Sequence, residues 1–412
     1  MGSMKQNGLC LANCRRKIPV TMKSLLVNIP LGHMANDWAP GALWIITPAI
    51  GASLGLSPSE IGLLITIHYI GAAMGYFPAG LLADRVSNQG RLLTITFFWV
   101  GLGYLLASQA PGFWSLAILL AIAGMGDAAW HPIATGVLVE TMPDRRGMVL
   151  GIHAMGGTLA EVGAPLLAGF LLGFMGWQQA LQISAIPALV MGVVFLFFAR
   201  KIPPSPAEAI SRFELGRIAR HWLRPLGIAL TIKIAAYNMA LMALMSMTPL
   251  FLQRELDYNP ASAGLVFAMA MLLGSLLQPV VGRYSDGRDR QLVFIGGSLI
   301  AVVFSITAFA ASPGALVVGS LIVAMAVLVS VRSSILASAV EYASTRAATT
   351  LGFVFVLLDG VGALGALMAG YLGEFDLQYA FGFAAGLSGL SIAISILIQR
   401  TGLTKAGAMQ TQ

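Results

Sequence analysis

The chain has 412 residues, of which 57% are hydrophobic and only 10% are charged. A mean hydropathy of +0.82 excludes a water-soluble globular protein and indicates a polytopic membrane protein, long enough for about twelve spans of roughly 20 to 25 residues. The formal net charge of +7 reflects membrane topology rather than nucleic-acid binding, because the basic residues gather on one side of the predicted spans.

In chain order, a tail at 1–23 precedes one block of spans at 24–200, a linker at 201–224, a second block at 225–400 and a tail at 401–412. Each block is predicted to be a six-helix bundle, so the fold class is all-α with two pseudo-symmetric halves. The apolar runs predict spans at 24–53, 59–82, 92–110, 113–139, 148–173, 178–199, 225–252, 260–282, 291–311, 314–340, 349–373 and 377–399.

The polar segments outside the spans carry few signals. The first tail lacks an apolar core long enough for a cleavable signal peptide, and its Cys10 and Cys14 are expected to be inert. The linker is rich in proline and basic residues, and is expected to lie along the membrane surface with an amphipathic helix around 207–221.

The two blocks repeat the same pattern about 202 residues apart, with a one-residue slip in their later parts. The matching positions include Gly62 with Gly264, Asp84 with Asp286, Glu140 with Glu341, Gly151 with Gly352, and Gly169 with Gly370. Internal duplication of this kind is typical of secondary carriers, in which the substrate site lies between the repeats near the middle of the membrane.

Positive charges predict the orientation of the spans. Of the 24 Lys and Arg residues, all but three fall in the two tails and in the loops on the same side as the tails. Arg254 lies on the opposite side, whereas Lys233 and Arg332 lie within spans. Because basic residues next to spans stay preferentially in the cytoplasm, both termini are predicted to be cytoplasmic.

Ionisable side chains within the spans follow a period of three helices. Such groups cost roughly 2.5 to 3.5 kcal/mol on insertion scales, so a span that carries them must face protein or water. The third, sixth, ninth and twelfth spans carry none in their interiors and are expected to face lipid. The first, fourth, seventh and tenth spans are expected to surround a central aqueous cavity.

Two acid and histidine pairs have helical spacing. His33 and Asp37 lie four residues apart, as do Asp127 and His131, so each pair shares one face of its helix. A desolvated carboxylate with a basic neighbour can exchange protons near neutral pH. We therefore predict that proton coupling is carried by Asp37, His33, Asp127 and, in the fifth span, Glu161.

Substrate contacts are expected from the same helices and from their repeat counterparts. Arg332 occupies the repeat position of His131, and Asn238 occupies that of Asn36. Trp130 and Tyr237 could line a substrate pocket, and their alternative role is packing between helices. The predicted substrate-binding residues are His131, Arg332, Asn36, Trp130, Tyr237 and Asn238.

A short motif follows the second span of each block. Glycine allows close helix approach, and the Asp and Arg side chains can hold the ends of the spans together in one conformation, which we expect to be the outward-open one. The predicted gating residues are Gly80, Asp84, Arg85 and Arg91 in the first copy, and Gly282, Asp286 and Arg290 in the second.

The first copy resembles the loop signature of the major facilitator superfamily, and the fifth span, with Gly163 and Pro165, resembles a loose form of its antiporter motif. Within the superfamily, the chain resembles the fosmidomycin-resistance branch in His33 to Asp37, Trp130 to Pro132, Arg146-Gly147 and Gly156-Gly157. That resemblance implies a monomer in a bacterial inner membrane that exports small drug-like or anionic compounds against protons. Asp127 and Glu161 depart from the branch, which favours a more cationic or zwitterionic substrate.

Neither the phosphate-binding loop of an ATP-driven pump nor a hydrolase motif occurs, so the chain is not expected to be an enzyme. The leading hypothesis is a proton-coupled antiporter that exports a small organic solute by alternating access. Proton-coupled import of a nutrient or siderophore-like molecule, a divalent-metal carrier and a non-transporting sensor stay open. The expected partners are the solute, protons and lipid, without nucleic acid, cofactor or resident metal.

Overall fold

The computed structural model describes residues 20–142, 145–204, 216, 220–286, 289–343 and 352–400. Within these ranges the elements are all helical, which confirms the predicted all-α class. In the described part of the chain, eleven helices are long and apolar enough to cross a membrane. Most of the predicted amphipathic helix around 207–221 lies outside the described residues, as do Cys10 and Cys14.

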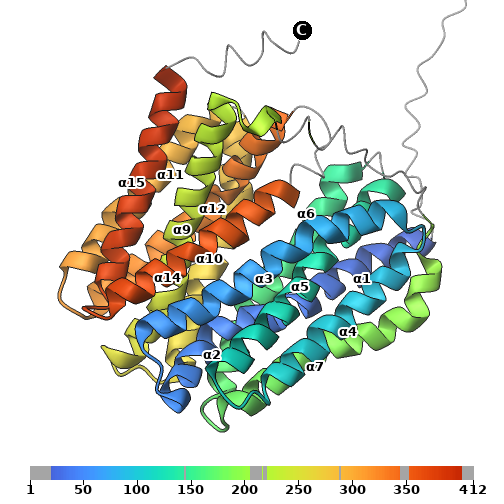
Figure 1. The fold of residues 1–412 in the computed structure, drawn as a ribbon. Coiled ribbons are helices and arrows are strands. Elements are labelled where there is room, and N and C mark those ends of the chain that lie inside the picture. The colour runs from blue at the N-terminus through green and yellow to red at the C-terminus, as the bar shows by residue number, and fades with distance from the viewer. Residues whose placement is uncertain are drawn as a thin grey trace, which may run out of the picture.

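Among the described residues the first half contains eight helical elements; the first two run in the same direction, and the five helices after them alternate in direction across the bundle (Figure 1). They are α1 (Val20–Asn36), α2 (Trp38–Leu54), α3 (Pro58–Arg85), α4 (Gln89–Ala107), α5 (Phe113–Thr141), α6 (Arg146–Leu171), α7 (Trp177–Phe198) and the short η2 (Ala199–Lys201). We call the side where α1 begins the terminal side, and the side where α2 ends the far side.

The helices of the second half also alternate in direction, beginning on the terminal side, and the last of them ends on that side too (Figure 1). Its elements are α9 (Pro225–Arg254), α10 (Pro260–Asp286), α11 (Arg290–Ala310), α12 (Ala315–Ala343), η3 (Val356–Val361), α14 (Gly362–Gly373) and α15 (Tyr379–Arg400).

The first predicted span, 24–53, is divided at Asp37 into α1 and α2, each of 17 residues. Helical hydrogen bonds continue on both sides of the division, from Asp37 N–H to the His33 carbonyl and from Gly41 N–H to the Asp37 carbonyl. Pro40 has no N–H to donate to the carbonyl of Asn36, and this missing bond explains a kink at this level. The kink places Asp37 where two helix segments meet.

The predicted span at 349–373 also departs from a regular helix, because Val356–Val361 forms a π-helical turn that contains Asp359. Such a turn frees backbone carbonyls from their usual partners. The side-chain amide of Asn238 on α9 donates a hydrogen bond to the Leu358 carbonyl within this turn. Asn238 and the irregular turn therefore stabilise each other.

On the far side, helices of the two halves approach closely through glycines. Gly62 on α3 lies against Ala366 and Gly370 on α14, and Gly264 on α10 lies against Pro165 and Gly169 on α6. A Cβ atom at Gly62 would lie 2.3 Å from the Ala366 carbonyl oxygen, and one at Gly264 would lie 2.6 Å from the Pro165 carbonyl oxygen. The duplicated glycines thus pair crosswise and close the far side.

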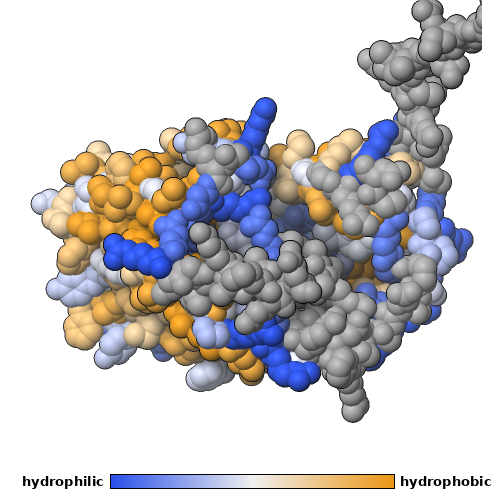
Figure 2. All heavy atoms as spheres, turned by 90° about the horizontal axis from the view of Figure 1, so that it is seen from above, coloured by the Kyte–Doolittle hydropathy of each residue, from blue (hydrophilic) through white to orange (hydrophobic). Residues whose placement is uncertain are grey.

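Among the helices predicted to face lipid, α7, α11 and α15 are the least buried of the spans. α4 is more buried than this prediction implies, because it packs against both α5 and α7. The view from above shows hydrophilic side chains in a band between hydrophobic flanks (Figure 2). Apolar surface on the flanks and charge at one face is the arrangement expected of a protein that crosses a bilayer.

Candidate functional site

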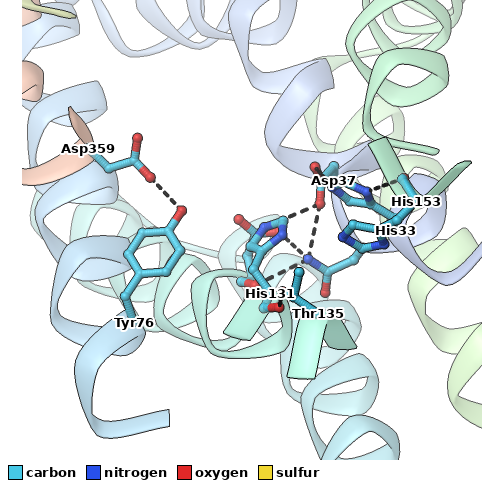
Figure 3. Close-up of polar contacts among 9 residues, drawn as sticks. His33, Asp37, Tyr76, His131, Thr135, His153 and Asp359 are labelled. Carbon is cyan, nitrogen blue, oxygen red and sulfur yellow. Dashed lines mark hydrogen bonds and ion pairs between the residues drawn. The ribbon is translucent and has the colours of Figure 1, made fainter. Parts of the chain in front are cut away.

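Three ionisable side chains meet at the kink between α1 and α2 (Figure 3). His33 Nε2 lies 3.1 Å from Asp37 Oδ2, and His131 Nε2 on α5 lies 3.6 Å from Asp37 Oδ1. Their side chains are 12%, 22% and 20% exposed for His33, Asp37 and His131 respectively. Charged groups that are partly exposed in the middle of a bundle indicate access to water, since lipid would exclude them.

The hydrogen bonds of His33 determine where its protons lie. Its Nδ1 is 2.8 Å from the backbone carbonyl oxygen of His153 on α6. Because a carbonyl can only accept, Nδ1 must carry the proton of that bond. Nε2 then faces the Asp37 carboxylate at 3.1 Å, and two lone pairs at this distance would repel each other. A second proton therefore belongs to the pair, bound to either His33 Nε2 or Asp37 Oδ2.

Packing holds the His33 ring in place. It contacts the rings of both His153 and Trp130, with ring centroids 4.2 and 5.4 Å away, and those two rings also stack on each other at 5.5 Å. On α6, a Cβ atom at Gly157 would lie 2.8 Å from His33 Cε1, so the absence of a side chain there makes room for the imidazole. The Gly156-Gly157 pair singled out in the sequence thus lets α6 approach the proton-bearing pair.

Asn36 joins two acidic groups of the first half, Asp37 and Asp127. Its Nδ2 lies 2.5 Å from Asp127 Oδ1, 3.2 Å from Asp37 Oδ1 and 3.2 Å from the Asp127 backbone carbonyl. Its own Oδ1 is buried and accepts no hydrogen bond among the described residues. The predicted partnership of Asp127 with His131 is not formed as an ion pair; Asp127 binds the Asn36 amide instead.

The second half contributes Arg332 on α12 and Asp359 on η3. The charge of Arg332 interacts with Glu161 across the interface and with Asp359 in its own half. Asp359 accepts a hydrogen bond of 2.5 Å from the hydroxyl of Tyr76 on α3, as Figure 3 shows. Both side chains are buried, so this bond links the two halves close to the middle of the membrane.

Besides Asn36, three of the predicted substrate-binding residues have buried positions. The Tyr237 hydroxyl donates to the Leu328 carbonyl at 2.5 Å, Asn238 binds the Leu358 carbonyl, and Trp130 stacks on histidines. In this conformation all three side chains hold helices together. A substrate contact by these residues stays a prediction, as it does for His131, Arg332 and Asn36.

The predicted gating residues lie at the terminal-side ends of their helices. In the second copy, Arg290 pairs with Asp286 and with Glu341 on α12, each at 3.0 Å. In the first copy, Arg85 and Arg91 are exposed, and a Cβ atom at Gly80 would lie 3.9 Å from Pro132. Asp84 also has an interaction partner. The two Arg290 ion pairs lie within one half, and the predicted gating role stays untested.

The far-side closure involves residues that were not predicted to act in gating. The Ser59 N–H donates to Glu374 Oε1 at 2.9 Å, and Arg254 Nη2 donates to the Leu56 carbonyl at 3.1 Å. Both bonds join the two halves. Arg254 did carry a signal, since it is the one basic residue predicted outside the terminal side and the spans, whereas Ser59 and Glu374 carried none.

His33, Asp37 and His131 each offer one ligand atom, and these atoms lie within 4.8 Å of one another. Two imidazoles and one carboxylate form a donor set that divalent transition metals accept. The Nδ1 bond of His33 to a backbone carbonyl would also orient its ring as in many metal sites. The same cluster is thus chemically suited to protons and to a divalent cation.

Comparison with known proteins gives several relatives that are described as transporters or transport proteins. The chain is 28% identical over 216 residues to the putative niacin/nicotinamide transporter NiaP of Bacillus subtilis, a match that covers 50% of the chain and about half, 53%, of that relative. It is 25% identical over 392 residues to a putative metabolite transport protein of Haemophilus influenzae, covering 90% of the chain and 93% of the relative.

Among solved structures, a bacterial homologue of the human lysosomal transporter Spinster, in an inward-facing and occupied conformation, has the same fold, with a TM-score of 0.75 and 17% identity over 93% of this chain and 97% of that one. Residues 31–366 match the Major Facilitator Superfamily. The transporter architecture predicted from the sequence is confirmed, and the chain is a secondary transporter, not an enzyme, that belongs to the Major Facilitator Superfamily.

Proposed function

We propose that this transporter is a proton-coupled antiporter that exports a small organic solute by alternating access, as the resemblance to the fosmidomycin-resistance branch suggests. The observation that carries the proposal is the His33–Asp37 pair. With Nδ1 of His33 committed to a carbonyl, the pair must hold one further proton, and Asp37 is 22% exposed. A proton held at a site that water can reach is what coupling requires.

Alternating access requires a conformation that is closed on one side only. The crosswise glycine contacts and the Ser59–Glu374 bond close the far side. If the terminal side faces the cytoplasm, as the positive charges favour, this conformation is the one that would load solute from inside the cell. We place the protein in the bacterial inner membrane as a monomer, with its termini in the cytoplasm.

The energetics are sufficient for export. A proton that crosses about 100 mV releases roughly 2.3 kcal/mol, which supports a solute gradient of about 50-fold. Release of the His33–Asp37 proton would leave two lone pairs facing each other, so deprotonation and a change of conformation are physically linked.

The test is proton movement in proteoliposomes loaded with a pH-sensitive dye and challenged in turn with phosphonates, other organic anions and organic cations. We expect a solute-dependent proton flux that is lost in Asp37→Asn and kept in Asp376→Asn, which neutralises an exposed acid outside the spans. Uphill transport retained by Asp37→Asn would overturn the assignment of the coupling residue. Protons and solute moving in the same direction would indicate import instead.

The metal-ligand geometry favours one second candidate, a carrier of divalent cations. The observation is the mutual spacing of the ligand atoms of His33, Asp37 and His131. Proteoliposomes that accumulate Co²⁺ or Mn²⁺ in a way that His131→Ala abolishes, and that move no organic solute, would establish it. Flux of an organic solute without any uptake of metal would exclude the divalent-cation carrier.

A further inference from the structure

The first half of the site contains more hydrogen-bond acceptors than donors. Asn36 Nδ2, with two hydrogens, faces Asp37 Oδ1, Asp127 Oδ1 and the Asp127 carbonyl. Asn36 is fully buried, and its Oδ1 has no donor among the described residues. Leaving a buried acceptor unpaired is costly, so a ligand that brings several donors would be bound favourably at this place.

The charges around Asp127 favour a cation as that group. No Lys, Arg or His within the described part of the chain lies at ion-pair distance from Asp127, whereas Asp37 is paired with His33. The charges of Asp37 and Asp359 act on Asp127 and repel a second negative charge there. Asp127 is only half-buried, so a solute can reach it.

We propose that Asp127 and Asn36 form the subsite for a protonated amine of the transported solute. This inference rests on the proposed function and specifies its substrate class. An ammonium group brings three donors and one positive charge, which is enough to satisfy the half-buried Asp127 carboxylate that Asn36 Nδ2 orients. An alcohol brings one donor and no charge, and a carboxylate would add to the repulsion.

Arg332 in the second half could receive a carboxylate of the same solute. It already interacts with Glu161 and Asp359, however, so its charge is balanced without a ligand. The amine end is therefore the recognition element, and a further anionic end is compatible with it but not required.

The experiment is equilibrium binding to the full-length protein in detergent, by isothermal titration calorimetry at neutral pH without a gradient. The probes are amines on phenylethyl, indolylethyl and butyl skeletons, each with its alcohol and carboxylate counterpart. We expect the amines to bind about tenfold or more tightly than their counterparts, as charge-assisted hydrogen bonds imply. Wild-type protein that binds no amine of the set, or binds the carboxylates more tightly, contradicts the proposal.

The matched variants are Asp127→Asn and Asp359→Asn. Asp127→Asn keeps the size and one acceptor for Asn36 but removes the charge, so amine affinity should fall about tenfold to hundredfold while alcohol affinity stays unchanged. Asp359→Asn removes a nearby negative charge that already accepts a hydrogen bond from Tyr76 and interacts with the charge of Arg332. It should therefore weaken amine binding much less. Equal losses in both variants would show a general field effect and overturn the subsite. If a variant fails to fold, the wild-type ranking of amine, alcohol and carboxylate decides.

The two proposals fail separately. Amine selectivity is measured as binding without a gradient, whereas proton coupling is measured as flux through Asp37. Proton-coupled flux of carboxylates with no amine binding would contradict the amine subsite but not the proton coupling. Amine binding that depends on Asp127, without proton movement, would contradict the proton coupling but not the amine subsite.

Discussion

Gly62 on α3 lies against the carbonyl oxygen of Ala366 on α14, so closely that a Cβ atom on Gly62 would come within 2.3 Å of that oxygen. Its repeat counterpart, Gly264, has the same relationship to the Pro165 carbonyl at 2.6 Å. Both contacts join the two halves on the far side. The closed far side therefore depends on the absence of two side chains.

Gly62→Val should prevent the far side from closing. The backbone of α14 cannot move locally by the distance that a valine needs, so the halves must separate there. We expect increased labelling of a cysteine introduced at Pro58, which lies against Gly370 and Gly373 of α14, by a membrane-impermeant reagent, and a large loss of transport. Gly386→Val is the matched control, because a Cβ atom at Gly386 would meet no atom within 4 Å. Unchanged labelling in Gly62→Val would contradict this account of closure.

Acid on the far side should favour opening there through Glu374. Slight burial acts to raise the pKa of Glu374, but hydrogen bonds from Ser59 and Ser57 lower it below its usual value. A lowered pKa in the closed state means that closure is favoured above the pKa of the free carboxyl and is lost as the pH falls through the lowered pKa. Labelling of the Pro58 cysteine should increase as the pH on the far side falls below about 4.5, the usual pKa of the free carboxyl.

Glu374→Gln keeps an acceptor for the Ser59 N–H but does not titrate, so the labelling of the Pro58 cysteine should become independent of pH in this variant. A pH response that is identical in Glu374→Gln and the wild type would assign the response to another group.

Tyr76→Phe should shift the conformational equilibrium away from this state. The Tyr76 hydroxyl is the hydrogen-bond donor at 2.5 Å to the buried Asp359 carboxylate, and the bond joins the two halves. Its loss leaves a buried acceptor unpaired, at about 1–3 kcal/mol, or roughly a fivefold to hundredfold change in the equilibrium. Electron–electron distances between spin labels on the far-side ends of α3 and α14 would measure this shift in the conformational equilibrium.

Tyr371→Phe provides the control for that measurement, since Tyr371 is exposed on α14. A distance distribution in Tyr76→Phe that matches the wild type would show that the hydroxyl does not stabilise this conformation.

Asn238→Leu should destabilise the fold rather than alter solute recognition directly. Asn238 is buried and donates to the Leu358 carbonyl within the π-helical turn. Removing this donor leaves a buried carbonyl without a hydrogen bond, which should lower the free energy of unfolding by about 1–3 kcal/mol. Unfolding in mixed micelles would measure the loss. Asn28→Leu is the matched control, because the Asn28 amide bonds within its own helix, to Ser24. Weaker solute binding with unchanged unfolding would instead support the predicted substrate contact.

Much of the architecture follows from local patterns. The apolar runs predicted the spans within a few residues, since burying apolar side chains in lipid requires only length and composition. Helical spacing brought His33 and Asp37 together correctly, because four residues make about one turn of a single helix. The glycines at 62 and 264 were recognised as a repeat, although their partners were not.

Contacts between helices depend on how the helices pack. Asp127 has helical spacing to His131, yet it binds Asn36, because α1 and α5 pack against each other at this level. The bond between Tyr76 and Asp359 joins residues 283 positions apart and depends on a π-helical turn that no sequence period announces. The sequence by itself determined the membrane spans, the duplication and the supply of buried charges, since these are properties of single helices. Only the tertiary structure decided which charges meet, because that depends on the approach and rotation of helices distant in the chain.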